Sequence, residues 1–420
     1  MPEPSDAHEI VHVFGALSPQ IEEEIASVSS VLQSWGYDVR VIGPLSRTGR
    51  SLLRAAGVIT QEYSEQAPRS AGARWSEARA LAGVIREAHP ALIHAHGFRA
   101  AFAGVLARGG GARRVPVVVS PHLLPQIVQE DARLGLRARA YRWLLAKADA
   151  VVVPTEAQRD DLAELSPTDA DRAEVVPYAR PAGPPLDSLD LGRRRMLLGI
   201  TQSAVVVGCV IDGLAQEALE EFLDAAASVC MEYPSLEFAL IGRDVDHERF
   251  HDLAHRRGLL GATVFVDPHE RFRRAISALN VLVTPQRGWP SGMLALQAIA
   301  ANVGVVAVED GEVAEILIGS PHVTVAPASG PDALGEAIIR RLHAAAQQMT
   351  PELDVAPEAG GEISMLVSKD FFDLEDRWEA PADRDASRTD ERPADPIAQF
   401  NPTHAARALV GIYHRLFDED

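Results

Sequence analysis

The stretch of residues 281–301, VLVTPQRGWPSGMLALQAIAA, constrains the fold of this chain more than any other. Its first three residues are apolar and are followed by Thr284 and Pro285, which predicts a short buried strand. Ser291 and Gly292 then open a segment whose apolar residues recur at helical spacing, which predicts a helix. A strand, a glycine-bearing turn and a helix N-terminus form one unit of an α/β domain. The free N–H groups of such a terminus attract anions.

The same alternation of short apolar strands and amphipathic helices recurs along most of the 420 residues. The strands that it predicts begin near residues 9, 37, 91, 115, 150, 204, 236, 264, 281 and 303. Strands that alternate with helices are typical of parallel sheets, and a chain of this length suffices for two domains with separate cores. A proline-rich segment at residues 180–185, RPAGPP, predicts the linker between them.

Charge and residue usage narrow the classes of partner and cofactor. The formal net charge of −19 argues against nucleic acid, because a nucleic-acid site needs a basic surface. The N-terminus carries acids where a signal peptide needs positive charge, and no run of eighteen apolar residues is present, so we expect a cytoplasmic protein without a transmembrane segment. Cys209 and Cys230 form no metal-ligand pattern, and we expect neither a metal site nor a cofactor.

Residues 351–399 interrupt the alternation of strands and helices. They carry fourteen acidic and five basic residues together with several prolines, which predicts a disordered or loosely packed acidic insertion. An apolar island within it, at residues 363–378, could dock on this protein or on a protein partner. After the insertion, a final amphipathic helix is predicted towards the C-terminus.

Residues 281–301, the opening βαβ pattern and the segment WGYDVRVIGP at residues 35–44 together resemble glycosyltransferase family 4, the group 1 glycosyl transferases. The resemblance implies the α/β GT-B fold, in which two Rossmann-like domains face each other and a C-terminal helix crosses back to the first domain. It assigns an acceptor-side domain to residues 1–182 and a nucleotide-sugar donor-side domain to residues 187–345. The acidic insertion then covers residues 346–399, and the helix of residues 400–420 packs on the N-terminal domain.

Histidines at the ends of predicted strands match positions of the family. His94 and His96 lie in the segment HAHG, and His122 follows the strand predicted at residues 115–119. The resemblance implies that His122 lines the cleft and approaches the donor sugar, which makes it the candidate catalytic residue. The alternative is a histidine that is simply packed or solvated at the end of a strand.

Candidate donor-binding residues lie in the second predicted domain. The resemblance places the donor against the N–H groups that open the helix of the 281–301 stretch and beside several polar or aromatic side chains. The candidates are Gly292, Met293, Leu294, Gln297, Arg287, Trp289, Arg243 and Glu315.

Several positions that bind the donor in the family carry other residue types here. Trp289 and Gln297 stand where the family has two glutamates, and Cys209 and Leu214 replace an arginine and a lysine that hold the phosphates. Glutamates at residues 22–24 stand near a helix start where the family has a glycine pair, and they would repel a diphosphate. Each group that stabilises the leaving diphosphate is worth about 10²–10³ in rate. Because several such positions carry other residue types, we expect an eroded donor site.

Compensation for these losses is conceivable. Arg287 or Arg243 could reach the phosphates, Trp289 could stack on a sugar or base, and Gln297 could hydrogen-bond a ribose.

The basic amphipathic helix predicted at residues 133–150 has two interpretations. It is either a solvated arginine face on a core helix or, through residues 133–149, a peripheral contact with the inner face of a membrane or with a phosphate-bearing acceptor.

Three functions therefore remain open. The first is a catalytically impaired or non-catalytic homologue with a binding or regulatory role in glycan or polysaccharide synthesis, with residues 351–399 as a possible protein interface. The second is an active retaining glycosyltransferase that takes a hexosyl group from a nucleotide sugar at an atypical site and passes it to a glycan or a lipid-linked acceptor. The third is an unrelated α/β binding protein or an epimerase-type enzyme of the same architecture.

Overall fold

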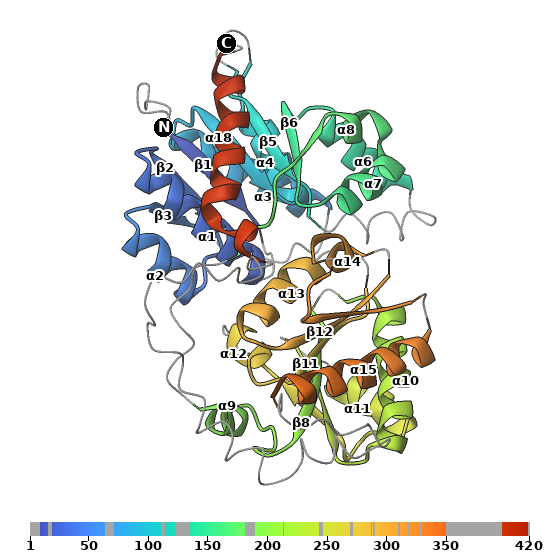
Figure 1. Cartoon of the computed structure of the whole chain (residues 1–420). Coiled ribbons are helices and arrows are strands. Elements are labelled where there is room, and N and C mark those ends of the chain that lie inside the picture. The colour runs from blue at the N-terminus through green and yellow to red at the C-terminus, as the bar shows by residue number, and fades with distance from the viewer. Residues whose placement is uncertain are drawn as a thin grey trace. The chain divides into compact units, whose positions relative to one another are not determined.

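The computed structural model of the chain (Figure 1) describes residues 9–15, 19–63, 71–110, 114–122, 135–180, 190–212, 214–242, 247–268, 272–286, 288, 290–309, 311–317, 319–327, 330–349 and 397–418. Contacts divide the chain into two compact units. Met1–Gly183 and Gln399–Asp420 form the N-terminal unit, and Pro184–Ala398 form the C-terminal unit. The apolar island predicted at residues 363–378 lies outside the described residues.

The N-terminal unit contains a seven-stranded sheet of order β3-β2-β1-β4-β5-β6-β7, in which all paired strands are parallel. Its strands are β1 (Ile10–Phe14), β2 (Val39–Gly43), β3 (Ile59–Glu62), β4 (Leu92–His96), β5 (Val117–Ser120), β6 (Ala150–Val153) and β7 (Ala173–Val175). The central strands β1, β4 and β5 are fully buried and mostly apolar because helices cover both faces of the sheet. The chain moves outwards in opposite directions from β1 and β4, so these neighbours form the topological switch point, where ligands of such sheets bind.

The helices of this unit are α1 (Pro19–Ser34), α2 (Arg47–Ala55), α3 (Ala71–Glu87), α4 (Phe98–Ala107), α6 (Gly135–Leu145), α7 (Glu156–Leu165), α8 (Pro167–Asp171) and α18 (Pro402–Asp418). The last of them comes from the far end of the sequence. Figure 1 shows α18 alongside α1 of the N-terminal unit, and the two helices are in contact. The N–H of Arg180 donates to the carbonyl of Phe400 at 2.7 Å, and the Tyr37 hydroxyl pairs with His414 Nε2 at 2.9 Å. The predicted return of a C-terminal helix to the first domain is confirmed.

The C-terminal unit contains a six-stranded sheet of order β10-β9-β8-β11-β12-β13, again with parallel pairs. Its strands are β8 (Val205–Val210), β9 (Leu236–Ile241), β10 (Thr263–Val266), β11 (Val281–Thr284), β12 (Gly304–Val308) and β13 (Val323–Ala326). Its helices are α9 (Leu191–Leu197), α10 (Gln216–Glu232), α11 (His247–Arg256), α12 (Phe272–Ile276), α13 (Ser291–Ala300), α14 (Glu312–Ile316) and α15 (Pro331–Met349), and the short helix η2 (Ala398–Phe400) leads to α18. The predicted strand at residues 281–283 and the helix after it are β11 and α13.

A buried arginine anchors α9 to the sheet of the C-terminal unit. Arg195 is 1% exposed, and its guanidinium donates to the carbonyl oxygens of Ala278 and Ala204 at 2.9 and 2.8 Å. It also donates to the side-chain oxygen of Asn280 at 2.8 Å, and that oxygen accepts the N–H of Val206 as well. A guanidinium with several donors in a rigid plane ties together the starts of β8 and β11.

Three strands that the sequence pattern did not predict, β3, β7 and β13, lie at sheet edges. β3 has the sequence ITQE, and β13 has only one buried residue, Ala326. An edge strand in an otherwise buried parallel sheet has one pairing partner and faces solvent, so it need not show the apolar run that identifies a central strand.

Candidate functional site

The N-terminus of α13, where the sequence predicts an anion site, is occupied by a side chain of the protein. The backbone N–H of Gly292 donates to Glu312 Oε2 at 3.1 Å, and Glu312 is 0% exposed. The N–H of Leu294 donates to the carbonyl of Pro290 at 3.1 Å. Of the three N–H groups expected to face a donor, those of Gly292 and Leu294 are therefore used within the protein.

Glu312 reaches this position because of the sheet order. β11 and β12 are adjacent parallel strands, so the helices that follow them, α13 and α14, begin at the same edge of the sheet and contact each other. Glu312 is the first residue of α14, and a carboxyl group near the N-terminus of α13 is favoured by that helix's dipole. Sequence reasoning selected Glu315 on the same helix, which is exposed, and missed Glu312. The strand–turn–helix pattern at residues 304–316 was the available signal.

Other candidate donor positions in the C-terminal unit are buried in its interior. Gln297 is 4% exposed on α13, and Met293 is 1% exposed. Cys209 is 0% exposed within the core of the unit, where burial raises the pKa of its thiol, and Leu214 packs against the same core. Neither Cys209 nor Leu214 supplies a cation for a phosphate. The candidates Arg243, Arg287 and Trp289 lie outside the described residues.

The glutamates at the start of α1 make contacts within the N-terminal unit. Glu22 is 8% exposed and accepts the N–H of Ser46 at 2.7 Å. Glu24 accepts the N–H of Ala179 at 3.0 Å. These carboxyl groups hold neighbouring loops to α1.

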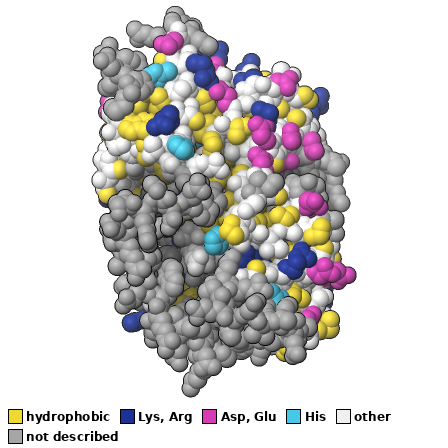
Figure 2. All heavy atoms as spheres, viewed as in Figure 1, with side chains coloured by type: hydrophobic (Ala, Val, Ile, Leu, Met, Phe, Trp, Pro, Cys, Tyr) yellow, Lys and Arg dark blue, Asp and Glu magenta, His cyan; other side chains and the backbone are white. Residues whose placement is uncertain are grey.

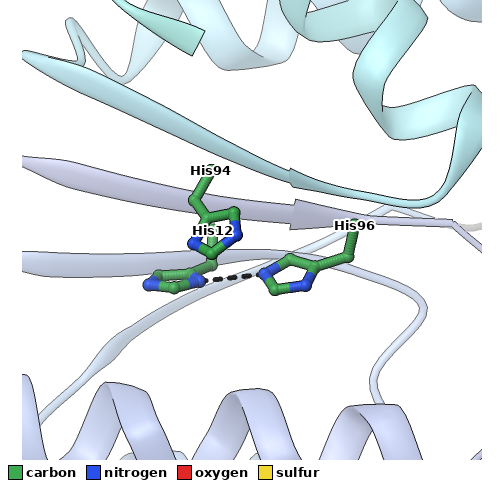
Figure 3. A group of neighbouring side chains, drawn as sticks. All are labelled: His12, His94 and His96. Atoms are coloured by element: carbon green, nitrogen blue, oxygen red, sulfur yellow. Dashed lines mark hydrogen bonds between the residues drawn. The ribbon is translucent and has the colours of Figure 1, made fainter. Parts of the chain in front are cut away.

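A second cluster of polar side chains lies at the switch point of the N-terminal unit. His12 on β1 is the register partner of His94 on β4, and His96 lies two residues further along β4 on the same face. Figure 3 shows the three rings gathered beside the two strands, with His12 Nδ1 bonded to His96 Nε2 at 3.1 Å. His96 Nδ1 in turn lies 3.3 Å from His122 Nε2, so the cluster extends to the end of β5.

Hydroxyl groups fix the ring of His94. Its Nδ1 lies 2.6 Å from the hydroxyl of Tyr413 on α18, and its Nε2 lies 2.9 Å from Ser120 Oγ at the end of β5. Sequence reasoning identified His94, His96 and His122 but not His12 or Tyr413. No local motif marks either of those two, because strand pairing and the return of α18 bring them to the site.

Burial keeps these histidines neutral. His12 and His94 are 1% exposed, and His96 and His122 are 7% exposed. Burial lowers the pKa of His12 and of His122 to about 4. The pKa values of His94 and His96 fall well below the usual range, first because of burial and then because neighbouring histidines disfavour a second positive charge.

The cluster faces a cavity of about 50 Å³ in the N-terminal unit. Its polar lining consists of the four histidines, Ser120, Tyr178 and Glu24, and its apolar lining comes from α1, α18 and the ends of β6 and β7. His122 has a left-handed backbone with φ of 30°, a conformation that non-glycine residues rarely adopt and that is found disproportionately at functional sites. The volume suits an ion or a few waters.

An aromatic and basic surface, formed by Trp75, Phe98, Trp143 and arginines of the same helices, covers part of α3, α4 and α6. Trp75, Phe98 and Trp143 are 48%, 36% and 47% exposed and are joined through Phe102, whose ring centroid lies 5.6, 6.4 and 6.1 Å from theirs. Four arginines of the same three helices are exposed: Arg79, Arg99, Arg139 and Arg142. Figure 2 shows acidic and basic side chains interspersed over the described part of one face of the molecule. Among the described residues, no helix has both the length and the apolar content to cross a membrane.

Comparison with known families and proteins agrees with this architecture. Residues 21–179 match the family described as glycosyl transferase 4-like domain, and residues 202–344 match the glycosyl transferases group 1. A D-inositol 3-phosphate glycosyltransferase of Kribbella flavida is 26% identical over 269 residues, which cover 59% of this chain and 62% of the relative. A 2-deoxystreptamine N-acetyl-D-glucosaminyltransferase of Streptomyces fradiae is 28% identical over 179 residues, which cover 40% of this chain and 41% of the relative. The matched region thus spans less than two thirds of either relative.

A solved structure shows the same fold over nearly the whole chain. Anabaena Alr3699/HepE in complex with UDP-glucose superimposes with a TM-score of 0.66 at 15% identity, over 97% of this chain and 100% of that one. At this identity the likeness concerns the fold alone.

Proposed function

The chain belongs to the group 1 glycosyltransferase family and has its GT-B fold, and we propose that it is a non-catalytic homologue with a binding role in glycan synthesis. The hydrogen bond from the Gly292 N–H to the buried Glu312 carboxyl group carries this proposal. In a transferase, the terminus of the corresponding helix faces an anionic donor. Here the protein's own carboxyl group occupies that N–H, and its negative charge opposes a second anion.

The buried replacements at other donor positions support the same function. Cys209 and Leu214 pack into the apolar core of the unit and provide no cation against a departing diphosphate. Gln297 offers a neutral amide in place of a carboxylate. Each fixed leaving-group donor contributes about 10²–10³ in rate, so the combined losses remove most of the catalytic advantage of the fold.

A second candidate function is an active transferase with an atypical donor site. It is favoured by the two curated relatives, both named as transferases, and by the UDP-glucose bound to the similar Anabaena structure. It requires Arg243, Arg287 or Trp289 to replace the missing phosphate and sugar contacts. A nucleotide sugar and a glycan or lipid-linked acceptor would then be the substrates.

Calorimetric titration with UDP, GDP and ADP, with and without Mg²⁺, separates the two functions. The non-catalytic homologue shows no binding at millimolar nucleotide, whereas micromolar binding by the natural protein would overturn the proposal and favour the active transferase. Glu312→Gln keeps an acceptor for the Gly292 N–H but removes the charge, so we expect it to gain measurable nucleotide affinity. Glu315→Gln is the matched control, because it removes an exposed charge from the same helix.

The aromatic and basic surface of α3, α4 and α6 supports a peripheral contact with an anionic membrane. Exposed tryptophans are favoured at the headgroup level, and arginines add attraction to anionic lipids. The formal net charge of the chain is −19, so an anionic membrane repels the protein as a whole. A local group of exposed arginines offsets this repulsion at one surface. A binding role at the membrane therefore accompanies the proposed function.

A further inference from the structure

We propose that His12, His94 and His96 form a binding site for a divalent transition-metal ion of the class that includes Zn²⁺ and Co²⁺. Each histidine offers a ring nitrogen, and these nitrogens all lie within 4.8 Å of one another. The rings belong to the two neighbouring strands β1 and β4, so the sheet itself holds the ligands together (Figure 3). The site lies within the N-terminal unit and shares no residue with the start of α13 in the C-terminal unit.

The spacing of the nitrogens is close to that of a tetrahedral centre. Two ligands at 2.0–2.1 Å from a tetrahedral ion lie about 3.4 Å apart. His12 Nδ1 and His96 Nε2 are already 3.1 Å apart. The ring of His94 stacks on that of His96, so the His94 ring must turn to bring one of its nitrogens, now within 4.8 Å of the others, to the same ion. The fourth position then opens to the adjoining cavity.

Partners outside the three ligands hold the rings in place. Metal-binding histidines nearly always pair their second ring nitrogen with another polar group. His96 Nδ1 pairs with His122, and His94 has a hydroxyl at each nitrogen, from Tyr413 and from Ser120. Whichever nitrogen of His94 binds the ion, the other keeps a hydroxyl partner.

His12 carries a polar atom that points to a missing ligand. Its Nε2 is buried and has no hydrogen-bond partner among the described residues. Buried ring nitrogens are normally bonded, and an unpaired one calls for a water or an ion in the adjoining cavity. In the ligand set above, Nδ1 of this ring binds the ion together with His96 Nε2, and Nε2 is left to bond a water in the adjoining cavity.

The chemistry of the donors selects the metal class. Three neutral imidazoles suit borderline ions such as Zn²⁺, Co²⁺ or Cu²⁺, whereas Mg²⁺ and Ca²⁺ require oxygen ligands. Glu24, the carboxylate that lines the cavity, already accepts the N–H of Ala179.

The test uses the untagged full-length chain after treatment with a chelator, since a polyhistidine tag would bind the same ions. Titration with Co²⁺ is followed by visible absorbance, and displacement by Zn²⁺ is then measured. We expect one Co²⁺ per chain with the intense bands of a four- or five-coordinate site. Binding of less than one equivalent, or weak octahedral bands only, would overturn the proposal.

Variants locate the ion. His96→Gln removes one ligand and should weaken Co²⁺ binding by more than 100-fold. Tyr413→Phe removes the hydroxyl that bonds Nδ1 of His94 and should weaken it by about 10–100-fold. His414→Gln is the control, because this histidine lies on α18 and pairs with Tyr37 instead of the cluster. Full Co²⁺ binding by a folded His96→Gln variant, or its loss in His414→Gln, would overturn the assignment.

A measurement on the natural protein tests the ligand set without relying on variants that could fail to fold. X-ray absorption at the zinc edge of the Zn²⁺-loaded chain counts imidazole ligands directly. We expect a shell of nitrogen and oxygen donors at about 2.0–2.1 Å with the scattering of three imidazoles. Scattering from one imidazole or none would place the ion elsewhere and overturn the proposal.

Discussion

The carboxyl group of Glu312 accepts the backbone N–H of Gly292 at 3.1 Å, so the start of α14 closes the start of α13. The two residues are twenty positions apart and meet because β11 and β12 are neighbours in the sheet. A helix terminus that the sequence marks as a site for an external anion thereby becomes an internal contact. This contact is the observation on which the proposed non-catalytic function rests.

Removing the acceptor of this contact should destabilise the C-terminal unit. Glu312→Ala leaves a buried N–H without its partner, which costs about 1–3 kcal/mol in the free energy of unfolding. Glu312→Gln keeps an acceptor and should cost less. Urea unfolding of both variants measures the difference, and equal midpoints for Glu312→Ala and the natural protein would contradict a structural role for the bond.

Arg195 should be among the most sensitive residues of the same unit. Arg195→Met removes a buried guanidinium that bonds three backbone carbonyls and the side chain of Asn280, so we expect a loss of about 1–3 kcal/mol or more, because buried acceptors are left without their donor. Arg193→Met, an exposed change on the same helix, should cost less than about 0.5 kcal/mol. Denaturant unfolding of the two variants side by side provides the check, and similar losses would exclude the bonds as the cause.

Stability should depend on pH through the buried histidines. The pKa of His12 falls to about 4 in the folded protein from an ordinary 6.5, so the unfolded state binds the proton more tightly. The contribution is fully present above pH 6.5 and is lost as the pH falls towards 4, by about 3 kcal/mol for one such histidine. Unfolding of the chelator-treated protein between pH 7 and 4.5 measures this slope.

A variant isolates the part of that slope that comes from His12. His12→Gln should flatten the pH dependence between pH 6.5 and 4, whereas the control His404→Gln, an exposed histidine, should leave it unchanged. An unaltered slope in His12→Gln would contradict the lowered pKa of this residue.

The aromatic and basic surface should bind anionic vesicles. We expect sedimentation of the protein with vesicles rich in phosphatidylglycerol, and little with phosphatidylcholine alone. Each arginine near such a surface contributes about 1 kcal/mol, so Arg139→Gln should lower the partition coefficient about fivefold. Arg256→Gln, an exposed change in the other unit, is the control, and equal losses for the two variants would exclude this surface.

Most of the fold was predictable because central parallel strands and the helices that cover them have strong periodic patterns. The runs IVHVF, LIHAH and VLVT are mostly apolar, and they became the fully buried strands β1, β4 and β11. The edge strands β3, β7 and β13 were missed because they have one pairing partner and carry more polar or exposed residues. The apolar pattern of a strand reflects how much of it is buried. Strand prediction is therefore weakest at the edges of a sheet, where the fewest residues are buried.

The histidines show the limit of that signal. HAHG and the position of His122 were visible as local features, whereas His12 is one polar residue within an apolar strand. Its role appears only once β1 pairs with β4 in a register that sets His12 against His94.

The sequence by itself determined the two parallel α/β units and the amphipathic character of the last helix, because composition and periodicity are properties of neighbouring residues. Only the tertiary structure decided that Glu312 closes the terminus of α13 and that His12, His94, His96 and Tyr413 meet. Those contacts join residues from 20 to 319 positions apart, and strand order and register bring them within bonding distance.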